Sequence, residues 1–144
     1  IIAPVGPVYQ AGTLSGNPIA MAAGLAMLNH LNADSELYTR LNEKATAIVN
    51  GLKAVNTEFG KSYTINQVGS MYTLFFTEKE VTNFESAKTS DTALFGKYFN
   101  EMLNRGVYLA PSQYESLFVS DAITQTEIDH IITSHRESLT QILA

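Results

Sequence analysis

The chain has 144 residues, of which 45% are hydrophobic and 16% are charged, and its formal net charge is −5 at pH 7. This balance is typical of a globular protein with a substantial core and excludes an intrinsically disordered chain. The negative charge and the lack of a Lys/Arg cluster argue against nucleic acid or an anionic membrane as a partner. The absence of cysteine excludes a disulfide framework and a thiolate metal site, and it is compatible with a reducing cytoplasm.

The sequence predicts neither a metal site nor a membrane span. Its three histidines are scattered, and His130 and His135 lie five positions apart, whereas ligands on one helix face lie three or four apart. No apolar stretch approaches the roughly 20 residues that a bilayer requires.

The chain opens with a loop that leads into a helix. The stretch 9–18 reads Tyr-Gln-Ala-Gly-Thr-Leu-Ser-Gly-Asn-Pro, in which Asn17 suits the N-cap and Pro18 the first helical position. A loop of this kind can bind an anion, because free N–H groups and the positive end of the helix dipole converge there. A plain turn followed by a cap explains the same residues equally well.

The first helix, expected over residues 18–31, is apolar on nearly every side. A helix without a polar face is expected to be buried or interfacial. Gly24 inside it is expected to mark the close approach of another backbone.

A longer helix is predicted over residues 35–59, because apolar side chains recur there every three or four positions. Gly60 is placed to end it as a C′ residue. Two short strands, 63–68 and 71–77, follow on either side of Gly69-Ser70 and predict an antiparallel pair or a strand–bulge–strand.

The last part of the chain begins with a polar connection over residues 78–91. A third helix is expected from about residue 92 to 105, then a strand over 107–109 and a short return strand over 117–119. Thr124-x-x-Glu127 is a capping box that opens a final amphipathic helix. The element order predicts an α+β fold in which helices cover one face of a small antiparallel sheet, preceded by a loop and a buried helix.

Several segments, in the right order along nearly the whole chain, resemble one enzyme family. They are GPVYQAGTLSGNPIAMAAG at 6–24, GSMYTLFFT at 69–77, Ser90-Asp91 before a helix, and GVYLAPSQYE at 106–115. Together they resemble the glutamate-1-semialdehyde 2,1-aminomutase family, pyridoxal-phosphate enzymes of fold type I related to the class III aminotransferases.

The resemblance implies a domain division and an origin for the chain. Residues 1–31 would be the end of the large cofactor domain, comprising a phosphate-contacting loop and an interface helix, and residues 32–144 the C-terminal small domain. Because the chain begins at Ile1 within the family's motif, we expect it to be the C-terminal portion of a longer polypeptide.

The resemblance also implies an activity, a cofactor and partners. The family isomerises glutamate-1-semialdehyde to 5-aminolevulinate, a precursor of tetrapyrroles, with pyridoxal 5'-phosphate or pyridoxamine 5'-phosphate. We accordingly expect a cytoplasmic homodimer with shared active sites, a small amino-aldehyde substrate, and neither nucleic acid nor a membrane as partner.

Four residues are carried over as site candidates. Gly12 and Thr13 match the family's loop that contacts the cofactor phosphate of the neighbouring subunit, although an ST-turn would also explain Thr13. Tyr9 would line the same shared site, but packing explains it as readily. Glu115 matches a carboxylate that faces the substrate pocket and can accept hydrogen bonds from an amino substrate, the alternative being a solvated loop glutamate.

The six lysines all fall on polar helix faces or in polar connections, which disfavours each of them as the Schiff-base lysine. In the family that lysine lies upstream of the first motif, so this chain alone is expected to be inactive. An ω-aminotransferase of the same superfamily is a second hypothesis, and a cofactor-free α+β interaction domain is a third.

The chain departs from the family pattern in three places. Tyr114 stands where Phe is common and Leu117 where Gly is often found. The segment 121–124, Asp-Ala-Ile-Thr, replaces an Ala-His-Thr-like stretch, so any contribution of that His is missing. These departures leave the family assignment intact and bear on the geometry of the substrate pocket.

Overall fold

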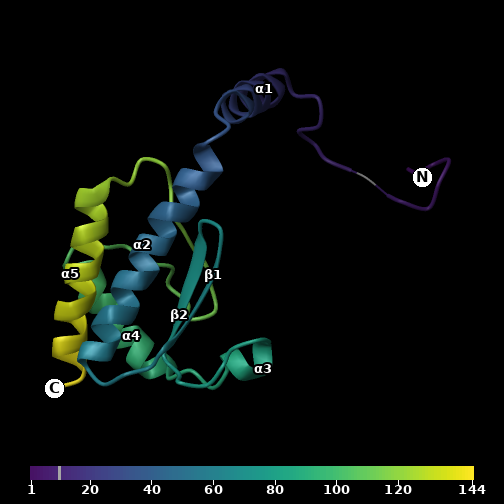
Figure 1. Ribbon diagram of the computed structural model, residues 1–144. Coiled ribbons are helices and arrows are strands. Elements are labelled where there is room, and N and C mark those ends of the chain that lie inside the picture. The colour runs from purple at the N-terminus through teal and green to yellow at the C-terminus, as the bar shows by residue number, and fades with distance from the viewer. Residues whose placement is uncertain (10) are drawn as a thin grey trace. The chain divides into compact units, whose positions relative to one another are not determined.

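The structure is a computed structural model that describes residues 1–9 and 11–144. The elements, in chain order, are α1 (Pro18–Ala33), α2 (Leu37–Glu58), β1 (Thr64–Val68), β2 (Met71–Phe75), α3 (Phe84–Ala87), α4 (Thr92–Asn104), β3 (Leu117–Phe118) and α5 (Gln125–Ile142) (Figure 1). The chain divides into two units, Ile1–Glu36 and Leu37–Ala144.

The second unit is built on a three-stranded antiparallel sheet in the order β1-β2-β3. β1 and β2 form a hairpin in which Val68 lies opposite Met71, so the predicted antiparallel pair is present without a bulge. Gly69 in the connecting turn has a φ of +56°, which glycine adopts without a steric penalty. β3 pairs only with Met71 and Tyr72, which leaves the later half of this edge of β2 without a strand among the described residues.

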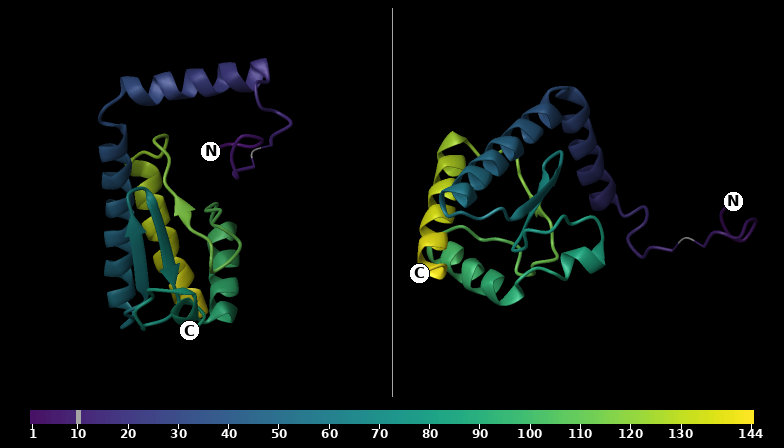
Figure 2. Two further views of the ribbon diagram at one scale, coloured as in Figure 1. Left: turned by 90° about the vertical axis from the view of Figure 1, so that its right-hand side faces the viewer. Right: turned by 60° about the horizontal axis from the view of Figure 1, so that its bottom comes forward.

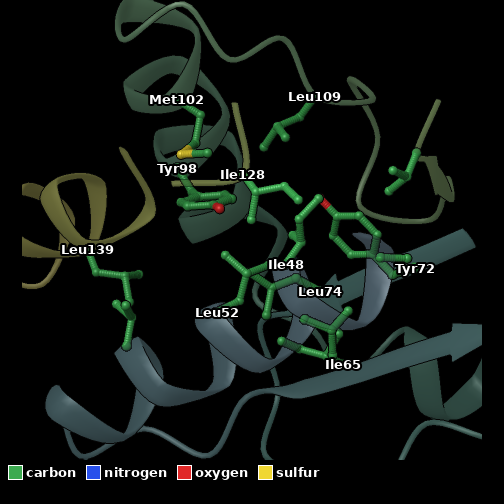
Figure 3. Packing of buried hydrophobic residues seen from close by; sticks show 14 of the residues in the cluster. Ile48, Leu52, Ile65, Tyr72, Leu74, Tyr98, Met102, Leu109, Ile128 and Leu139 are labelled. Carbon is green, nitrogen blue, oxygen red and sulfur yellow. The ribbon is translucent and has the colours of Figure 1, made fainter. Parts of the chain in front are cut away.

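Helices cover one face of this sheet. α2 packs against β1, β2 and α5, and α4 packs against α5; in the left-hand view of Figure 2, α5 lies behind the strands, with α2 to their left and α4 to their right. The core between these layers includes Ile48, Leu52, Ile65, Tyr72, Leu74, Tyr98, Met102, Leu109, Ile128 and Leu139 (Figure 3). The predicted α+β arrangement with one covered face is confirmed.

The ends of the helices follow their local sequence. Gly60 has a φ of +65°, and the N–H of Lys61 donates to the carbonyl of Asn56 at 2.9 Å, which is the Schellman arrangement expected after a C′ glycine. Gly106, with a φ of +81°, ends α4 in the same way. The capping box of Thr124 and Glu127 at the start of α5 is present as predicted.

One local prediction is wrong. Residues 107–109 are not a strand: the edge of β2 is occupied by β3 and, beyond it, by a glutamine side chain, so this segment has no ladder partner among the described residues. The polar connection predicted over 78–91 contains the short helix α3, which was not predicted. Asn83 and Ser86 form a capping box that begins this short helix.

The first unit contains α1, whose N-cap is Asn17 as predicted: its side chain accepts hydrogen bonds from the N–H groups of Ile19 and Ala20. The expectation that this helix is buried is not met in this chain, since α1 has no buried residue. Nor does a backbone approach Gly24, because no atom of the described residues lies within 4 Å of where its Cβ would stand. The apolar surface of α1 therefore remains available to a partner.

A buried polar network joins three helices within the core. The hydroxyl of Tyr98 in α4 lies 2.9 Å from Nδ1 of His135 in α5, and Nε2 of His135 lies 3.0 Å from Oδ1 of Asn56 in α2. Because the Asn56 oxygen can only accept, Nε2 carries the proton and Nδ1 accepts from the Tyr98 hydroxyl. Burial lowers the pKa of His135 to about 4, so the imidazole is neutral at pH 7.

The neutral His135 predicts a loss of stability in mild acid. The unfolded residue takes up a proton near pH 6.5, whereas the folded residue resists protonation until about pH 4. The contribution of neutral His135 to the free energy of unfolding is therefore complete above pH 6.5, and it is lost as the pH falls toward 4. Between pH 7 and pH 5 we expect the free energy of unfolding, measured by urea denaturation, to fall by about 2 kcal/mol. A His135→Gln variant should lack this part of the slope, and equal slopes in both proteins would contradict the assignment.

Because α2 packs closely on α5, we expect Gly→Ala substitutions at two helix-interior glycines to change the stability of the fold differently. A Cβ on Gly51 would overlap Cδ1 of Ile132 in α5, whereas a Cβ on Gly96 in α4 would meet nothing within 4 Å. Both substitutions to Ala gain similar helix propensity, so Gly96→Ala should raise the free energy of unfolding by about 1 kcal/mol. Gly51→Ala should be less stable than Gly96→Ala by about 1–3 kcal/mol, because it overpacks the interface. Adding Ile132→Val should recover part of the difference, and equal stability of the two Ala variants would show that the contact is not tight.

Candidate functional site

The loop before α1 consists of two consecutive turns. The N–H of Ser15 donates to the carbonyl of Gly12 at 3.1 Å, and the N–H of Asn17 donates to the carbonyl of Leu14 at 3.0 Å. Thr13 lies inside the first turn with its side chain exposed. The turns thus present Thr13 at the surface of the first unit, between a glycine and the start of a helix.

The hydroxyl of Thr13 has no hydrogen-bond partner within the described part of the chain, so the ST-turn alternative is not what the structure shows. The first amides of α1 are already bound by Asn17, and the Ser15 and Asn17 amides are used within the turns, which leaves an incoming anion the Thr13 hydroxyl and the remaining amides of the loop. Gly12 suits this position because a Cβ there would lie 2.7 Å from Oγ of Ser15. Tyr9 is 82% exposed, and Gln10 lies outside the described residues.

Glu115 lies in the second unit, in the loop 110–116 that leads into β3. Its side chain is exposed, and its carboxylate has no hydrogen bond or ion pair to any described residue. The Thr73 hydroxyl in β2 donates to the backbone carbonyl of Glu115 at 3.4 Å. The loop therefore holds the carboxylate at the surface, free to accept hydrogen bonds from a ligand.

Glu115 also lines a small cavity between β2, α4 and this loop. The other lining residues include Tyr72, Thr73, Leu74, Phe95, Tyr98, Met102, Leu109, Ser112 and Gln113. The cavity volume of about 20 Å³ holds roughly one water molecule and is too small for an amino-acid substrate. Burial raises the pKa of Tyr72 to about 12 and also raises that of Tyr98, so both phenols are neutral at pH 7.

Gln113 is a residue that the sequence analysis treated only as part of a loop. It is 3% exposed, and its Nε2 donates to the carbonyl of Leu74 at 2.8 Å while its Oε1 accepts from the N–H of Phe76 at 3.3 Å. In the sequence, neither the residues beside Gln113 nor any periodic pattern distinguishes it from a solvent-exposed glutamine.

Asp121 stands in the segment where the resembled family carries a histidine. Its carboxylate forms ion pairs of 2.8 Å with both Arg40 and Lys44 of α2, and Lys44 also donates to its backbone carbonyl. The hydrogen bonds from Arg40 and Lys44 lower the pKa of Asp121 to about 2. This segment is therefore fastened to α2 by ion pairs.

All six lysines lie in the described part of the chain, and each of them is exposed or half-buried. Lys44 is paired with Asp121, and Lys88 with Glu85. No buried lysine is therefore present as a Schiff-base candidate. Over the residues that the structure describes, no group of three or more His, Asp or Glu side chains is placed to hold a metal ion, and none of the helices is long and apolar enough to cross a bilayer.

Residues 1–142 match the protein-family model described as Aminotransferase class-III. The chain belongs to this family. It is 55% identical over 141 residues to the glutamate-1-semialdehyde 2,1-aminomutase of Cytophaga hutchinsonii, a match that covers 98% of this chain and 33% of that protein. The chain spans about a third of the length of the curated relatives that it matches.

Solved structures of a transaminase and of an aminomutase share the fold. A transaminase with PLP bound aligns with a TM-score of 0.77 at 19% identity, over 94% of this chain and 30% of that one. A glutamate-1-semialdehyde-aminomutase from Pseudomonas aeruginosa PAO1 in complex with PMP aligns with a TM-score of 0.67 at 18% identity, over 76% of this chain and 24% of that one. The resemblance drawn from the sequence motifs is confirmed at the level of family and fold, whereas Tyr9, Gly12, Thr13 and Glu115 remain predicted site residues.

Proposed function

We propose that this class-III aminotransferase chain is the C-terminal part of a glutamate-1-semialdehyde 2,1-aminomutase, which converts glutamate-1-semialdehyde into 5-aminolevulinate. The observation that carries the proposal is the 55% identity to an aminomutase over 98% of the chain. Other curated relatives with the same name, at 47% and 44% identity, support it. The reaction belongs to the full-length protein, in tetrapyrrole synthesis in the cytoplasm.

The first unit fits a role in holding the phosphate of pyridoxal or pyridoxamine 5'-phosphate. The Thr13 hydroxyl is exposed and unpaired within the described residues, and Gly12 beside it permits close approach of a ligand to the backbone. These two residues would bind the phosphate. When bound, the cofactor supplies the electron sink and the amino-group carrier that the reaction requires.

The second unit fits a role toward the substrate. The Glu115 carboxylate is exposed and has no partner among the described residues, so it can accept a hydrogen bond from an amino group or hold a proton beside it. We assign Glu115, with Tyr9 from the first unit, to the substrate pocket. The apolar lining behind Glu115 would keep water away from one side of the carboxylate.

The proposed enzyme is a homodimer with shared active sites. The apolar and wholly unburied α1 supports an interface with a second subunit, because such a surface is unfavourable in water. Residues 1–31 would then be the end of the large cofactor domain and residues 32–144 the small domain. The Schiff-base lysine would lie in the preceding part of the polypeptide, since no lysine here is buried, and the 144-residue chain alone would be inactive.

Product formation by the full-length protein tests the proposed function. Supplied with glutamate-1-semialdehyde alone, the holoenzyme should form 5-aminolevulinate over many turnovers, because the amino group stays within the substrate–cofactor pair. The product can be followed by colorimetric assay or mass spectrometry. Turnover that begins only after an external amino donor and acceptor are added would identify an ω-aminotransferase instead, and the absence of a bound cofactor would contradict both assignments.

Mixed dimers test the role of Thr13. Replacement of Thr13 by Val should weaken cofactor retention by about 10–100-fold, because a hydrogen bond to a charged group is worth about 1.5–3 kcal/mol. Mixing Thr13→Val subunits with subunits that lack the Schiff-base lysine should restore activity, since one site then receives the lysine from one subunit and Thr13 from the other. Thr13→Ser should retain the cofactor. Failure of the mixture to recover activity, with mixed dimers demonstrated, would place Thr13 in its own subunit's site.

A further inference from the structure

The edge of β2 that faces β3 presents a specific backbone problem. β3 pairs with Met71 and Tyr72 only, so the carbonyl of Leu74 and the N–H of Phe76 point toward an edge that no strand of the described residues covers. Both groups lie in the core region, where an unpaired backbone polar group is expensive. Something other than a strand must satisfy them.

The Gln113 carboxamide satisfies both groups at once. A residue in a parallel strand bonds to the carbonyl of one residue and to the N–H of the residue two positions further along its neighbour. Gln113 makes this pattern with its side chain, donating to Leu74 and accepting from Phe76. Because a side chain makes the bonds, the loop backbone stands away from the sheet, and Gln113 itself lines the cavity in that gap.

Among the described residues, the other hydrogen bonds between the loop 110–116 and the sheet come from Thr73, and the Tyr114 ring packs against Phe84 of α3 with ring centroids 5.6 Å apart. The Thr73 hydroxyl lies 3.4 Å from both the Glu115 carbonyl and Ser116 Oγ, so its single proton makes at most one long hydrogen bond or a shared one. The bonds that Ser112 makes to the next residues lie within the loop itself. Gln113 is thus the buried anchor of a loop whose exposed end carries Glu115, two residues further along.

We propose that Gln113 is a positioning residue: its carboxamide replaces a missing strand on β2, fixes the loop 110–116, and thereby holds the Glu115 carboxylate in place for the substrate. The proposal rests on the function proposed above, in which Glu115 faces the substrate. It gives the buried glutamine a role in substrate handling without direct contact with the reacting atoms.

The test compares Gln113→Met and Gln113→Glu with the wild-type full-length holoenzyme. Met keeps the length of the side chain but makes neither bond. A protonated Glu can still donate to Leu74 and accept from Phe76, whereas an ionised Glu cannot donate and repels the Leu74 carbonyl. Gln67→Met is the matched control, because Gln67 bonds to Thr46 in α2 and to the hairpin turn, away from this loop.

Two readouts are measured on each protein: amide hydrogen exchange of residues 112–116 and Phe76, and kcat and KM for glutamate-1-semialdehyde. Gln113→Met should exchange these amides at least tenfold faster and lose at least tenfold in kcat/KM, while it retains its cofactor. Gln113→Glu should approach wild type near pH 5 and diverge from it toward pH 8, each value being taken relative to wild type at the same pH. Gln67→Met should match wild type in both readouts.

A double variant separates positioning from a general loss of structure. If Gln113 acts through Glu115, then Gln113→Met should add little to the loss of activity already caused by Glu115→Gln. Additive losses, unchanged exchange in Gln113→Met, or no pH dependence in Gln113→Glu would each overturn the proposal. If the wild-type enzyme forms no 5-aminolevulinate, the proposed function fails, and hydrogen exchange still decides whether Gln113 fixes the loop.

Discussion

The second unit depends on the burial of one stripe of α2, which serves two partners at once. Ile48, Leu52 and Val55 are almost fully buried against the sheet and the other helices. Each such side chain contributes roughly 1.5–3 kcal/mol when it leaves water. Because α2 contacts both strands of the hairpin as well as α5, the loss of this stripe would remove the surface on which sheet and helix are assembled.

Burial of apolar side chains alone does not fix the alignment of α2, α4 and α5 along one another. Here a polar network and a steric contact fix it. The bonds of His135 to Tyr98 and Asn56 are satisfied in one alignment of α5 with α2 and α4, and the notch at Gly51 admits Ile132 in the same alignment. Two different interactions thus select one register, the polar one by hydrogen-bond geometry and the steric one by shape. Such agreement between independent constraints is what gives a sequence a single packing.

Features with a local cause could be predicted from the sequence, and features with a distant cause could not. The helix that ends at Gly60, the capping box at Thr124 and the one-sided sheet follow from periodicity and cap chemistry within a few residues. The strand expected at 107–109 failed because strand formation depends on a partner, and here the edge of β2 is taken by other groups. The buried position of Gln113 could not be predicted for the same reason, since its hydrogen-bond partners lie 39 and 37 positions away in the sequence. Thr13 and Glu115 were assigned roles through the family resemblance and remain predicted site residues.

On the proposed function, each unit presents surface groups that await a ligand or a partner. The first offers a hydroxyl in a glycine-flanked turn and an apolar helix with no buried residue, and the second offers a carboxylate with no partner among the described residues. An exposed polar group is hydrated and therefore free to exchange water for a ligand, whereas an exposed apolar surface is unfavourable in water and is expected where another chain covers it. The two units carry such features at the surface, and none of the lysines is buried. A chain with a third of its relatives' length would therefore contribute recognition groups to an active site whose covalent anchor lies elsewhere.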